Sequence, residues 1–259
     1  MKILLLAMLM LANTVFAKTL PPSVYLYNLS TGQTIIAENT YEVRPIASVT
    51  KLMTAMVAID YSNELDKKLS VNKKLKSHLP LKEHTRREVI TALLISSDNS
   101  AAETIAEDYP NGREGFMRAM NQKARDLNMP NTKFLDPSGL SVFNVSVAEE
   151  VAIMVHEASK YELIRQLTTT KQTTFDVPYK KKVRTTTLIN TNKHVLAEFT
   201  SIVTGKTGLT TAAGWCLGMA VENKDQKYLL VVLGSKSKQA RLQTVEQLMY
   251  NHIIDKASK

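Results

Sequence analysis

Alternating apolar and polar residues predict strands near both ends of the chain. The segment SVYLYNL alternates in this way, Ser30-Thr31-Gly32 turns the chain, and QTIIAEN follows. Alternation on both sides of a glycine-containing turn predicts a β-hairpin. After residue 170, four further segments have strand character: TTFDV, FTSIVTGKTG, GWCLGMAVE and KYLLVVLG.

The middle of the chain has helical patterns instead. The segment SVTKLMTAMVAID is apolar on nearly every side, which is typical of a buried helix. Between about residues 84 and 170 we expect four helices, in EVITALLISS, SAAETIAEDY, REGFMRAMNQKARDL and VAEEVAIMVHEASK, with turns at Pro110-Asn111-Gly112 and Asp136-Pro137-Ser138-Gly139. The last segment, KQARLQTVEQLMYNHIID, predicts an amphipathic helix.

This order of elements predicts an α/β (α+β) fold. A strand pair comes first, then a block of helices, then more strands and a terminal helix. An antiparallel sheet covered by helices fits this order, with a helical subdomain of about residues 70–170 inserted between the halves of the sheet. Because no repeat or flexible linker interrupts it, we expect residues 18–259 to form one domain.

The first 17 residues have the layout of a secretory signal peptide. MKILLLAMLMLANTVFA contains an early lysine, then an apolar run, and ends at the small residue Ala17. Lys18 ends the apolar run, which is too short for a spanning helix, although an uncleaved anchor is the alternative. Cleavage would leave 242 of the 259 residues, enough for a large core, and would export the protein, with a periplasmic location expected.

The charge and the single cysteine narrow the function classes. With 33 basic and 24 acidic residues the net charge is +9, which favours an anionic partner. Export and the lack of aromatic residues among the basic ones argue against nucleic acid. The densest basic run, Lys180-Lys181-Lys182 with Arg184, is interpreted as a solvated hairpin. Cys216 stands alone, which excludes an internal disulfide, and its apolar surroundings predict a core residue.

A serine followed three residues later by a lysine is a candidate nucleophile and base. On a helix the two side chains share a face, so that the amine can reach the hydroxyl. The spacing occurs at Ser48/Lys51, Ser70/Lys73 and Ser235/Lys238, and we expect the last two pairs to be solvated because their surroundings are polar. Only Ser48-Val49-Thr50-Lys51 opens an apolar helix, where burial would lower the pKa of the lysine. Helix capping by Ser48 is the structural alternative.

Two further short motifs, Ser97-Asp98-Asn99 and Lys206-Thr207-Gly208, carry groups that could assist a nucleophilic serine. Ser97-Asp98-Asn99 comes 49 residues after Ser48, where a hydroxyl and an amide could relay a proton and hold a substrate amide, or merely cap a helix. Lys206-Thr207-Gly208 closes a strand-like stretch and offers a charge, a hydroxyl and room for a substrate backbone along an edge strand. A phosphate loop is excluded because position 200 is Thr200, where that loop needs glycine.

Together, these three motifs are the set known from penicillin-binding proteins and class A β-lactamases. The chain resembles the low-molecular-mass penicillin-binding serine peptidases, in the branch of D-alanyl-D-alanine carboxypeptidases and endopeptidases, over essentially all of residues 18–259. The resemblance includes ASVTKLMTA (47–55), DPSGL (136–140), NTN (190–192) and KTGLTTAAGWCL (206–217). It implies a β-lactamase/transpeptidase-like fold.

The resemblance also implies roles for individual residues. Ser48 would be the acylated nucleophile, Lys51 its general base, and Ser97 and Asn99 would relay a proton and position the substrate. Substrate binding would involve Lys206, Thr207, Gly208 and Leu209, with backbone N–H groups of Ser48 and Leu209 as the oxyanion hole. Arg241 matches a family arginine that supports carboxylate recognition, although a surface charge on the last helix is an alternative. No metal or other cofactor is implied, and the histidines lack the H-E-x-x-H spacing of a zinc peptidase.

The resemblance implies that the protein binds peptidoglycan stem peptides and their cross-links, and that β-lactams are covalent inhibitors. A second enzyme of the cell wall is a further partner that the sequence leaves open. A β-lactamase is disfavoured because Glu149 and Glu150 lack the sequence context of the deacylating glutamate. The chain ends after the last helix of the sheet domain, a short layout that most resembles the endopeptidases of the branch; a carboxypeptidase that trims pentapeptide stems is the alternative. A non-catalytic wall-binding module is disfavoured because Ser48, Lys51 and Lys206 are all present.

Overall fold

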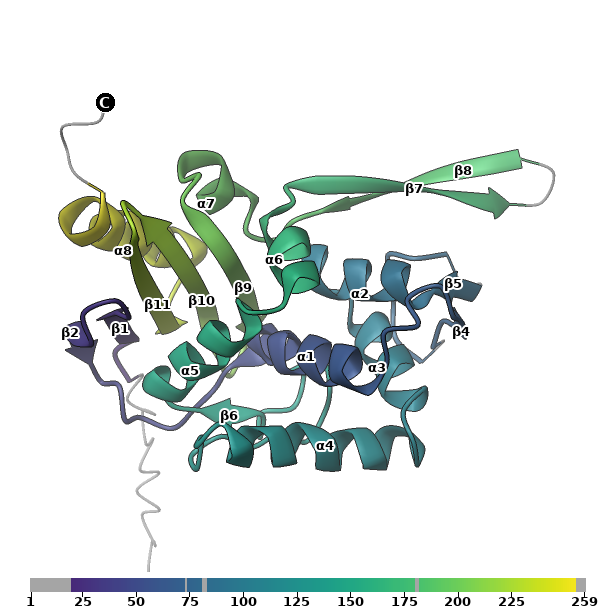
Figure 1. Ribbon diagram of the computed structural model, residues 1–259, viewed down its shortest axis with the longest axis horizontal. Helices are drawn as coiled ribbons and strands as arrows, with labels where there is room; N and C mark the ends of the chain where they lie inside the picture. The colour runs from purple at the N-terminus through teal and green to yellow at the C-terminus, as the bar shows by residue number, and fades with distance from the viewer. Residues whose placement is uncertain (1–19, 73, 81–82, 180–181, 255–259) are drawn as a thin grey trace, which may run out of the picture.

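Five antiparallel strands form the central sheet of the computed structural model, which describes residues 20–72, 74–80, 83–179 and 182–254. The N-terminal hairpin lies beside three strands from the C-terminal part of the chain, in the order β2-β1-β11-β10-β9 (Figure 1). The strands are β1 Ser23–Asn28, β2 Gln33–Glu38, β9 Ile202–Thr210, β10 Gly214–Asn223 and β11 Gln226–Ser235. The predicted antiparallel sheet is confirmed, whereas the predicted signal peptide lies outside the described residues.

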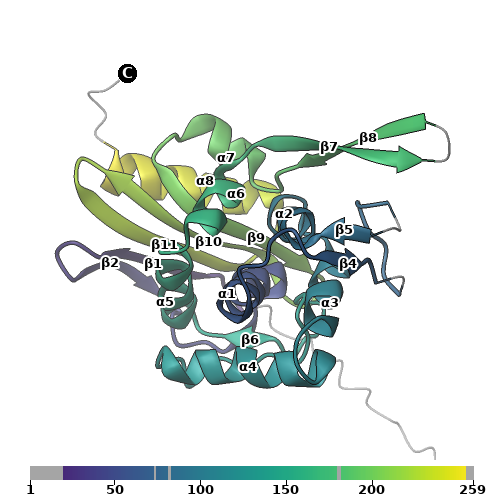
Figure 2. The ribbon, with the colours of Figure 1, turned by 45° about the vertical axis from the view of Figure 1, so that its right-hand side comes forward.

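Most of the remaining chain is helical, and α1 (Lys51–Tyr61) lies in the middle of the molecule (Figure 2). It contacts α2, α3, α4 and α5 and is buried along most of its length, which confirms the predicted buried helix. A 3-10 turn, Ala47–Thr50, precedes it, so Ser48 lies one turn before the α-helix rather than at its start. The other helices are α2 Arg86–Ile95, α3 Asn99–Glu107, α4 Gly112–Asp126, α5 Ala148–Ala158, α6 Glu162–Thr169, α7 Lys193–Glu198 and α8 Lys238–Leu248, which continues as a π-helical turn, Met249–Ile253.

Both faces of the sheet are covered by helices. On one face Leu217 and Met219 of β10 belong to the same apolar cluster as Val245 of α8. On the other face Gly218 lies so close to α5 that a Cβ there would stand 2.8 Å from Val155 Cγ2. Because burial of apolar surface on both sides is the main stabilising term, this double covering holds β9 and β10 against α5 and against the 3-10 turn that precedes α1.

Several elements escaped the sequence patterns. The sequence patterns did not predict the helices α6 and α7 or four short strands. These strands are β3 Arg44–Pro45, β4 Lys68–Ser70, β5 Glu83–Thr85 and β6 Val145–Ser146. The four strands have only two or three residues each, too few to show a period. β7 Gln172–Tyr179 and β8 Lys182–Ile189 form a two-stranded ribbon that extends from the body, in agreement with the expected hairpin (Figures 1 and 2). Lys180 and Lys181 of the basic run lie outside the described residues.

Candidate active site

The 3-10 turn that carries Ser48 is pressed between two neighbouring segments. A Cβ on Gly139 would lie 2.0 Å from the carbonyl oxygen of Ala47, and a Cβ on Gly208 would lie 3.0 Å from the backbone nitrogen of Ser48. Gly139 has φ +86°, which also favours glycine. Glycines in the 136–140 turn and in β9 therefore allow both segments to approach the backbone of Ser48 closely.

Lys51 is fully buried and its amine connects three segments. Its Nζ lies 3.0 Å from Ser48 Oγ, 2.7 Å from Asn99 Oδ1 and 2.6 Å from the carbonyl oxygen of Ser138. The amide oxygen of Asn99 and the carbonyl oxygen of Ser138 can only accept hydrogen bonds. A neutral amine would therefore donate its two N–H groups to these oxygens and direct its lone pair at the hydroxyl of Ser48. This arrangement suits a general base.

The pKa of Lys51 agrees with this role. Burial lowers the pKa to about 7, and the carboxylates of Asp136 and Asp98 offset the effect only in part. The neutral amine is therefore well populated near neutral pH, where a solvated lysine would be protonated. The sequence-based expectation that burial would lower this pKa agrees with the structure.

A second buried lysine, Lys206, contacts Ser97 and Thr207. Lys206 Nζ donates to Ser97 Oγ and to the carbonyl oxygen of Thr207, both at 3.0 Å. Burial lowers its pKa well below the ordinary value, and repulsion from Lys51 and Arg241 lowers it further. Ser97 has φ +59°, a left-handed conformation that costs a non-glycine residue about 1–2 kcal/mol. This turn aims the hydroxyl of Ser97 at Lys206 while the next residues start α3.

A small pocket opens in front of Ser48, with a volume of about 240 Å³. Arg241 also lines this pocket and is only 2% exposed. Its Nη1 donates to the carbonyl oxygen of Cys216 at 3.2 Å, and its guanidinium carbon lies 5.8 Å from the centre of the Trp215 ring. Within the part of the chain that the structure describes, no carboxylate pairs with Arg241, and burial lowers its pKa to about 10. An unpaired buried cation favours an anionic ligand group. The pocket is lined by Ser48, Ser97, Thr191, Thr207, Gly208, Leu209, Trp215 and Arg241.

The structure brings all the sequence-predicted site residues together. Six line the pocket, and Lys51, Asn99 and Lys206 are hydrogen-bonded partners directly behind it. The alternative that Arg241 is a surface charge is wrong, because the helix α8 that carries it packs against the sheet. Sequence reasoning assigned no role to the Ser138 carbonyl, to Thr191, whose hydroxyl lies 2.6 Å from that of Thr207, or to Trp215. All three lie in segments that carried the family resemblance, the only sequence signal pointing to them.

The other serine–lysine pairs do not form comparable sites. Ser70 is exposed on β4, and Lys73 lies outside the described residues. Ser235 is buried at the end of β11, so the expectation that it is solvated is wrong. Its Oγ has no hydrogen-bond partner in the described structure, and Lys238 therefore does not activate it.

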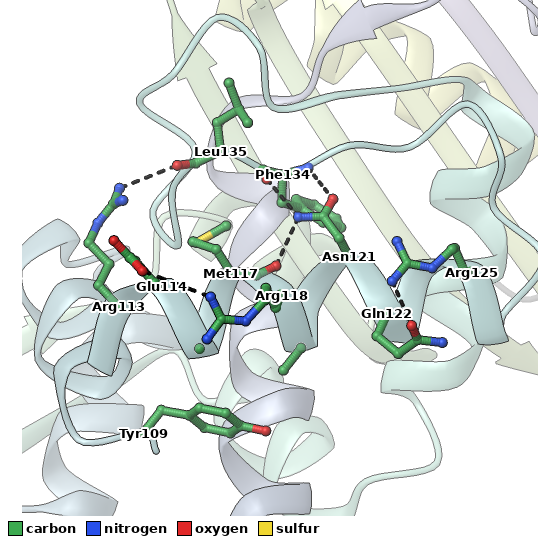
Figure 3. Close-up of a pocket in the computed structure, with 12 residues that line it drawn as sticks. Tyr109, Arg113, Glu114, Met117, Arg118, Asn121, Gln122, Arg125, Phe134 and Leu135 are labelled. Carbon is green, nitrogen blue, oxygen red and sulfur yellow. Dashed lines mark hydrogen bonds and ion pairs between the residues drawn. The ribbon is translucent and has the colours of Figure 1, made fainter. Parts of the chain in front are cut away.

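A second, larger pocket of about 810 Å³ lies along α4 (Figure 3), and none of its lining residues belongs to the pocket in front of Ser48. Its arginines are already engaged, since Arg113 pairs with Glu103, Arg118 with Glu114, and Arg125 donates to Gln122. Because the residues that line it include no serine, cysteine or lysine, its size does not make it a better candidate than the smaller pocket.

Comparisons with known proteins agree with this geometry. A family model described as D-alanyl-D-alanine carboxypeptidase matches residues 19–237. The D-alanyl-D-alanine endopeptidases of Escherichia coli and Pseudomonas aeruginosa are 39% and 36% identical, over 83% and 81% of this chain and 72% and 69% of their own lengths. The crystal structure of the Streptomyces K15 DD-transpeptidase has a TM-score of 0.81 at 27% identity, covering 88% of this chain and 94% of that one. The resemblance drawn from the motifs is thereby confirmed, and the chain belongs to the D-alanyl-D-alanine carboxypeptidase family of serine peptidases, with the fold of the penicillin-binding proteins.

Proposed function

We propose that this protein is a periplasmic D-alanyl-D-alanine endopeptidase that cuts peptidoglycan cross-links through an acyl-enzyme on Ser48 and is inhibited by β-lactams. The observation that carries the proposal is the hydrogen-bonding of Lys51, whose amine has two carbonyl-type acceptors and, 3.0 Å away, the hydroxyl of Ser48. The two endopeptidase relatives support the choice of substrate. The segments 47–55 and 206–217 also resemble those of penicillin-binding protein 7, a D-alanyl-D-alanine endopeptidase.

In the proposed reaction the hydroxyl of Ser48 transfers its proton to the amine of Lys51 as Ser48 Oγ attacks a D-alanyl carbonyl group. Ser48 Oγ forms a bond to the carbonyl carbon, and the tetrahedral intermediate then expels the amine of the second stem peptide. That amine takes up the proton that Lys51 received from Ser48, either directly or relayed by the hydroxyl of Ser97, so that both groups return to their starting forms. Water then hydrolyses the ester, which restores the hydroxyl of Ser48 and releases a carboxylate.

Negative charge on the attacked oxygen would be stabilised by backbone N–H groups. The backbone nitrogen of Ser48 faces β9 at the position of Gly208, and Leu209 follows directly on the same strand. Two N–H groups placed there would act as an oxyanion hole, at about 3–4 kcal/mol of transition-state stabilisation for each donor. The buried charge of Lys206 would add to this stabilisation when the amine is protonated.

Arg241→Gln is expected to raise KM about 10- to 100-fold, with a smaller effect on kcat, because a charged hydrogen bond to the substrate carboxylate is lost. Steady-state kinetics with a D-alanyl-D-alanine peptide measure this effect. Trp215 is the single tryptophan of the chain and packs against Arg241, so its emission should change on binding in the Ser48→Ala background. Equal KM values for the two proteins would contradict the carboxylate assignment.

The choice between endopeptidase and carboxypeptidase is tested by product analysis. Residues 18–259 are incubated with a D-alanyl cross-linked muropeptide dimer and with an uncross-linked pentapeptide, beside a Ser48→Ala control, and products are identified by mass spectrometry. We expect conversion of the dimer to monomers. Loss of one alanine from the pentapeptide alone would identify the alternative, a carboxypeptidase, which is the activity named for a 30% identical Bacillus subtilis relative.

Placement of the two candidate glutamates argues against a β-lactamase. Glu150 is buried and accepts hydrogen bonds from the backbone of Asn131 and the hydroxyl of Thr132, while Glu149 accepts one from Thr40. Both carboxylates therefore hold neighbouring turns together and contact neither Ser48 nor Lys51. Without a glutamate to activate water, a penicilloyl group on Ser48 should persist as a stable adduct.

Because Ser48, Lys51 and Lys206 are all present and in place, a non-catalytic wall-binding module is disfavoured.

The proposed periplasmic location rests on the predicted signal peptide, and a second enzyme of the cell wall as partner remains a hypothesis. In the residues that the structure describes, no helix is both long and apolar enough to cross a membrane.

A further inference from the structure

The middle residue of the Ser97-Asp98-Asn99 motif holds a segment from elsewhere in the chain. The side chain of Asp98 is fully buried. Its Oδ1 accepts from the backbone N–H of Ala101 at 2.9 Å and so caps α3. Its Oδ2 accepts from Ser77 Oγ at 2.9 Å, from the backbone N–H of His78 at 2.5 Å, and from His78 Nδ1 at 3.2 Å. One carboxylate therefore joins the motif to residues 77–78.

The same segment is fastened to α3 at a second point. Ser100 Oγ donates to the carbonyl oxygen of Asn72 at 2.5 Å, and the backbone N–H of Asn72 donates to Thr104 Oγ1 at 2.9 Å. Asn72 therefore contacts the side of α3, while Ser77 and His78 contact the residue that caps its first turn.

Both neighbours of Asp98 contact the two lysines of the pocket. Ser97, in its left-handed conformation, accepts from Lys206 Nζ, and Asn99 accepts from Lys51 Nζ. A left-handed serine persists only where surrounding contacts hold it. The hydrogen bonds to Asp98 are such contacts, since Asp98 follows Ser97 directly.

The imidazole of His78 carries a charge that depends on pH. Its side chain is 57% exposed, and its ring faces the carboxylate of Asp98. Among the described residues, Lys76 is the other charged group that affects its pKa. The hydrogen bond to Asp98 raises the pKa of His78 above its ordinary value, against the opposing effects of burial and of Lys76. Burial alone would raise the pKa of Asp98, but the bonds from His78, Ala101 and Ser77 outweigh it and leave that pKa lowered.

We propose that His78 is a positioning residue for the acylation of Ser48, acting from outside the pocket by holding Asp98 and thereby the orientation of Ser97 and Asn99. The proposal rests on the nucleophile and base assigned above. It assigns to the 77–78 segment a role in catalysis through the motif rather than through the substrate.

The direction of the pH effect follows from the charge of His78. The imidazolium form strengthens the bond to Asp98 at low pH, and this extra strength is lost as pH rises through the raised pKa of His78. The imidazolium also offsets the carboxylate of Asp98, which otherwise raises the pKa of Lys51. Both effects make loss of His78 most harmful at low pH.

The test measures the second-order rate constant for acylation by a fluorescent penicillin between about pH 5 and about pH 9. We expect the ratio of wild type to His78→Gln to be about tenfold near pH 6 and about twofold near pH 9. His78→Ala should show the same trend with larger ratios, because it also loses the hydrogen bond. His252→Gln, an exposed histidine on the last helical turn, is the matched control and should give a ratio near one at every pH.

A ratio that does not vary with pH would overturn the proposal, since loss of packing alone gives a constant factor. A second measurement does not depend on the folding of a His78 variant. It is an NMR titration of the histidine ring protons in the Ser48→Ala protein, which measures the pKa of His78 directly. A His78 pKa no higher than the ordinary histidine value of about 6.5 would equally overturn the proposal. If wild-type protein is not acylated at all, the proposed function fails instead, and the two failures are thereby distinguished.

Discussion

Replacing Ser48 with alanine is expected to abolish covalent labelling by penicillin and all peptide cleavage while leaving the fold intact. The hydroxyl oxygen of Ser48 is the atom that must bond to the attacked carbonyl carbon, and it lies 3.0 Å from Lys51 Nζ. The remaining residues of the 3-10 turn are buried and keep their packing in the variant. Intact-protein mass spectrometry after incubation with benzylpenicillin measures the adduct directly, and circular dichroism checks the fold.

Ser70→Ala is the matched control for this experiment. Ser70 has the same spacing to a lysine in the sequence but is exposed on β4, so its variant should be labelled like the wild type. An adduct that persists in Ser48→Ala would show that another residue is the nucleophile. Peptide mapping of the labelled protein would then locate it.

Lys51→Met is expected to lower the acylation rate constant about 10²- to 10⁴-fold, the usual contribution of a general base. Methionine fills a similar volume but has no lone pair able to accept the proton of Ser48. Stopped-flow acylation with a fluorescent penicillin measures the effect. Lys238→Met, which changes the lysine of the third serine–lysine pair, should leave the rate constant unchanged, and an equal loss in both variants would contradict a specific role for Lys51.

The wild-type rate constant should also rise with pH up to about 7 and then level off. The protonated amine of Lys51 has no free lone pair, and its pKa of about 7 sets the pH above which the neutral form prevails. Because burial lowers this pKa, the active neutral form is gained as pH rises through 7 and lost as pH falls. Lys51→Met should lack this dependence; a wild-type profile that still climbs steeply towards pH 10 would place the base at its ordinary pKa instead.

The sequence reached the main elements and most of the site for identifiable reasons. Alternation in SVYLYNL and the continuous apolar run in KYLLVVLG both predict strands, and each of these patterns is local. In the structure the two faces of β11 belong to two different apolar clusters, which explains why that strand is apolar throughout. The all-apolar helix after Ser48 predicted its burial for the same reason. The order of the three short motifs pointed to a shared pocket, but only through resemblance to a family, because residues 48, 97 and 206 have no local relation.

What the sequence by itself determined is therefore the element types and the identity of the reactive groups. The tertiary structure decided what those groups can do. The close approach of β9 to the turn at Ser48 depends on the register of β9 in the sheet. The carbonyl oxygen of Ser138, which accepts a hydrogen bond from Lys51, is a backbone atom that every residue type has, so the sequence does not single it out. The burial that lowers the pKa of Lys51 comes from the helices packed around α1, and the burial of Arg241 comes from the packing of α8 on the sheet. Such effects depend on distance in space, which a linear pattern does not record.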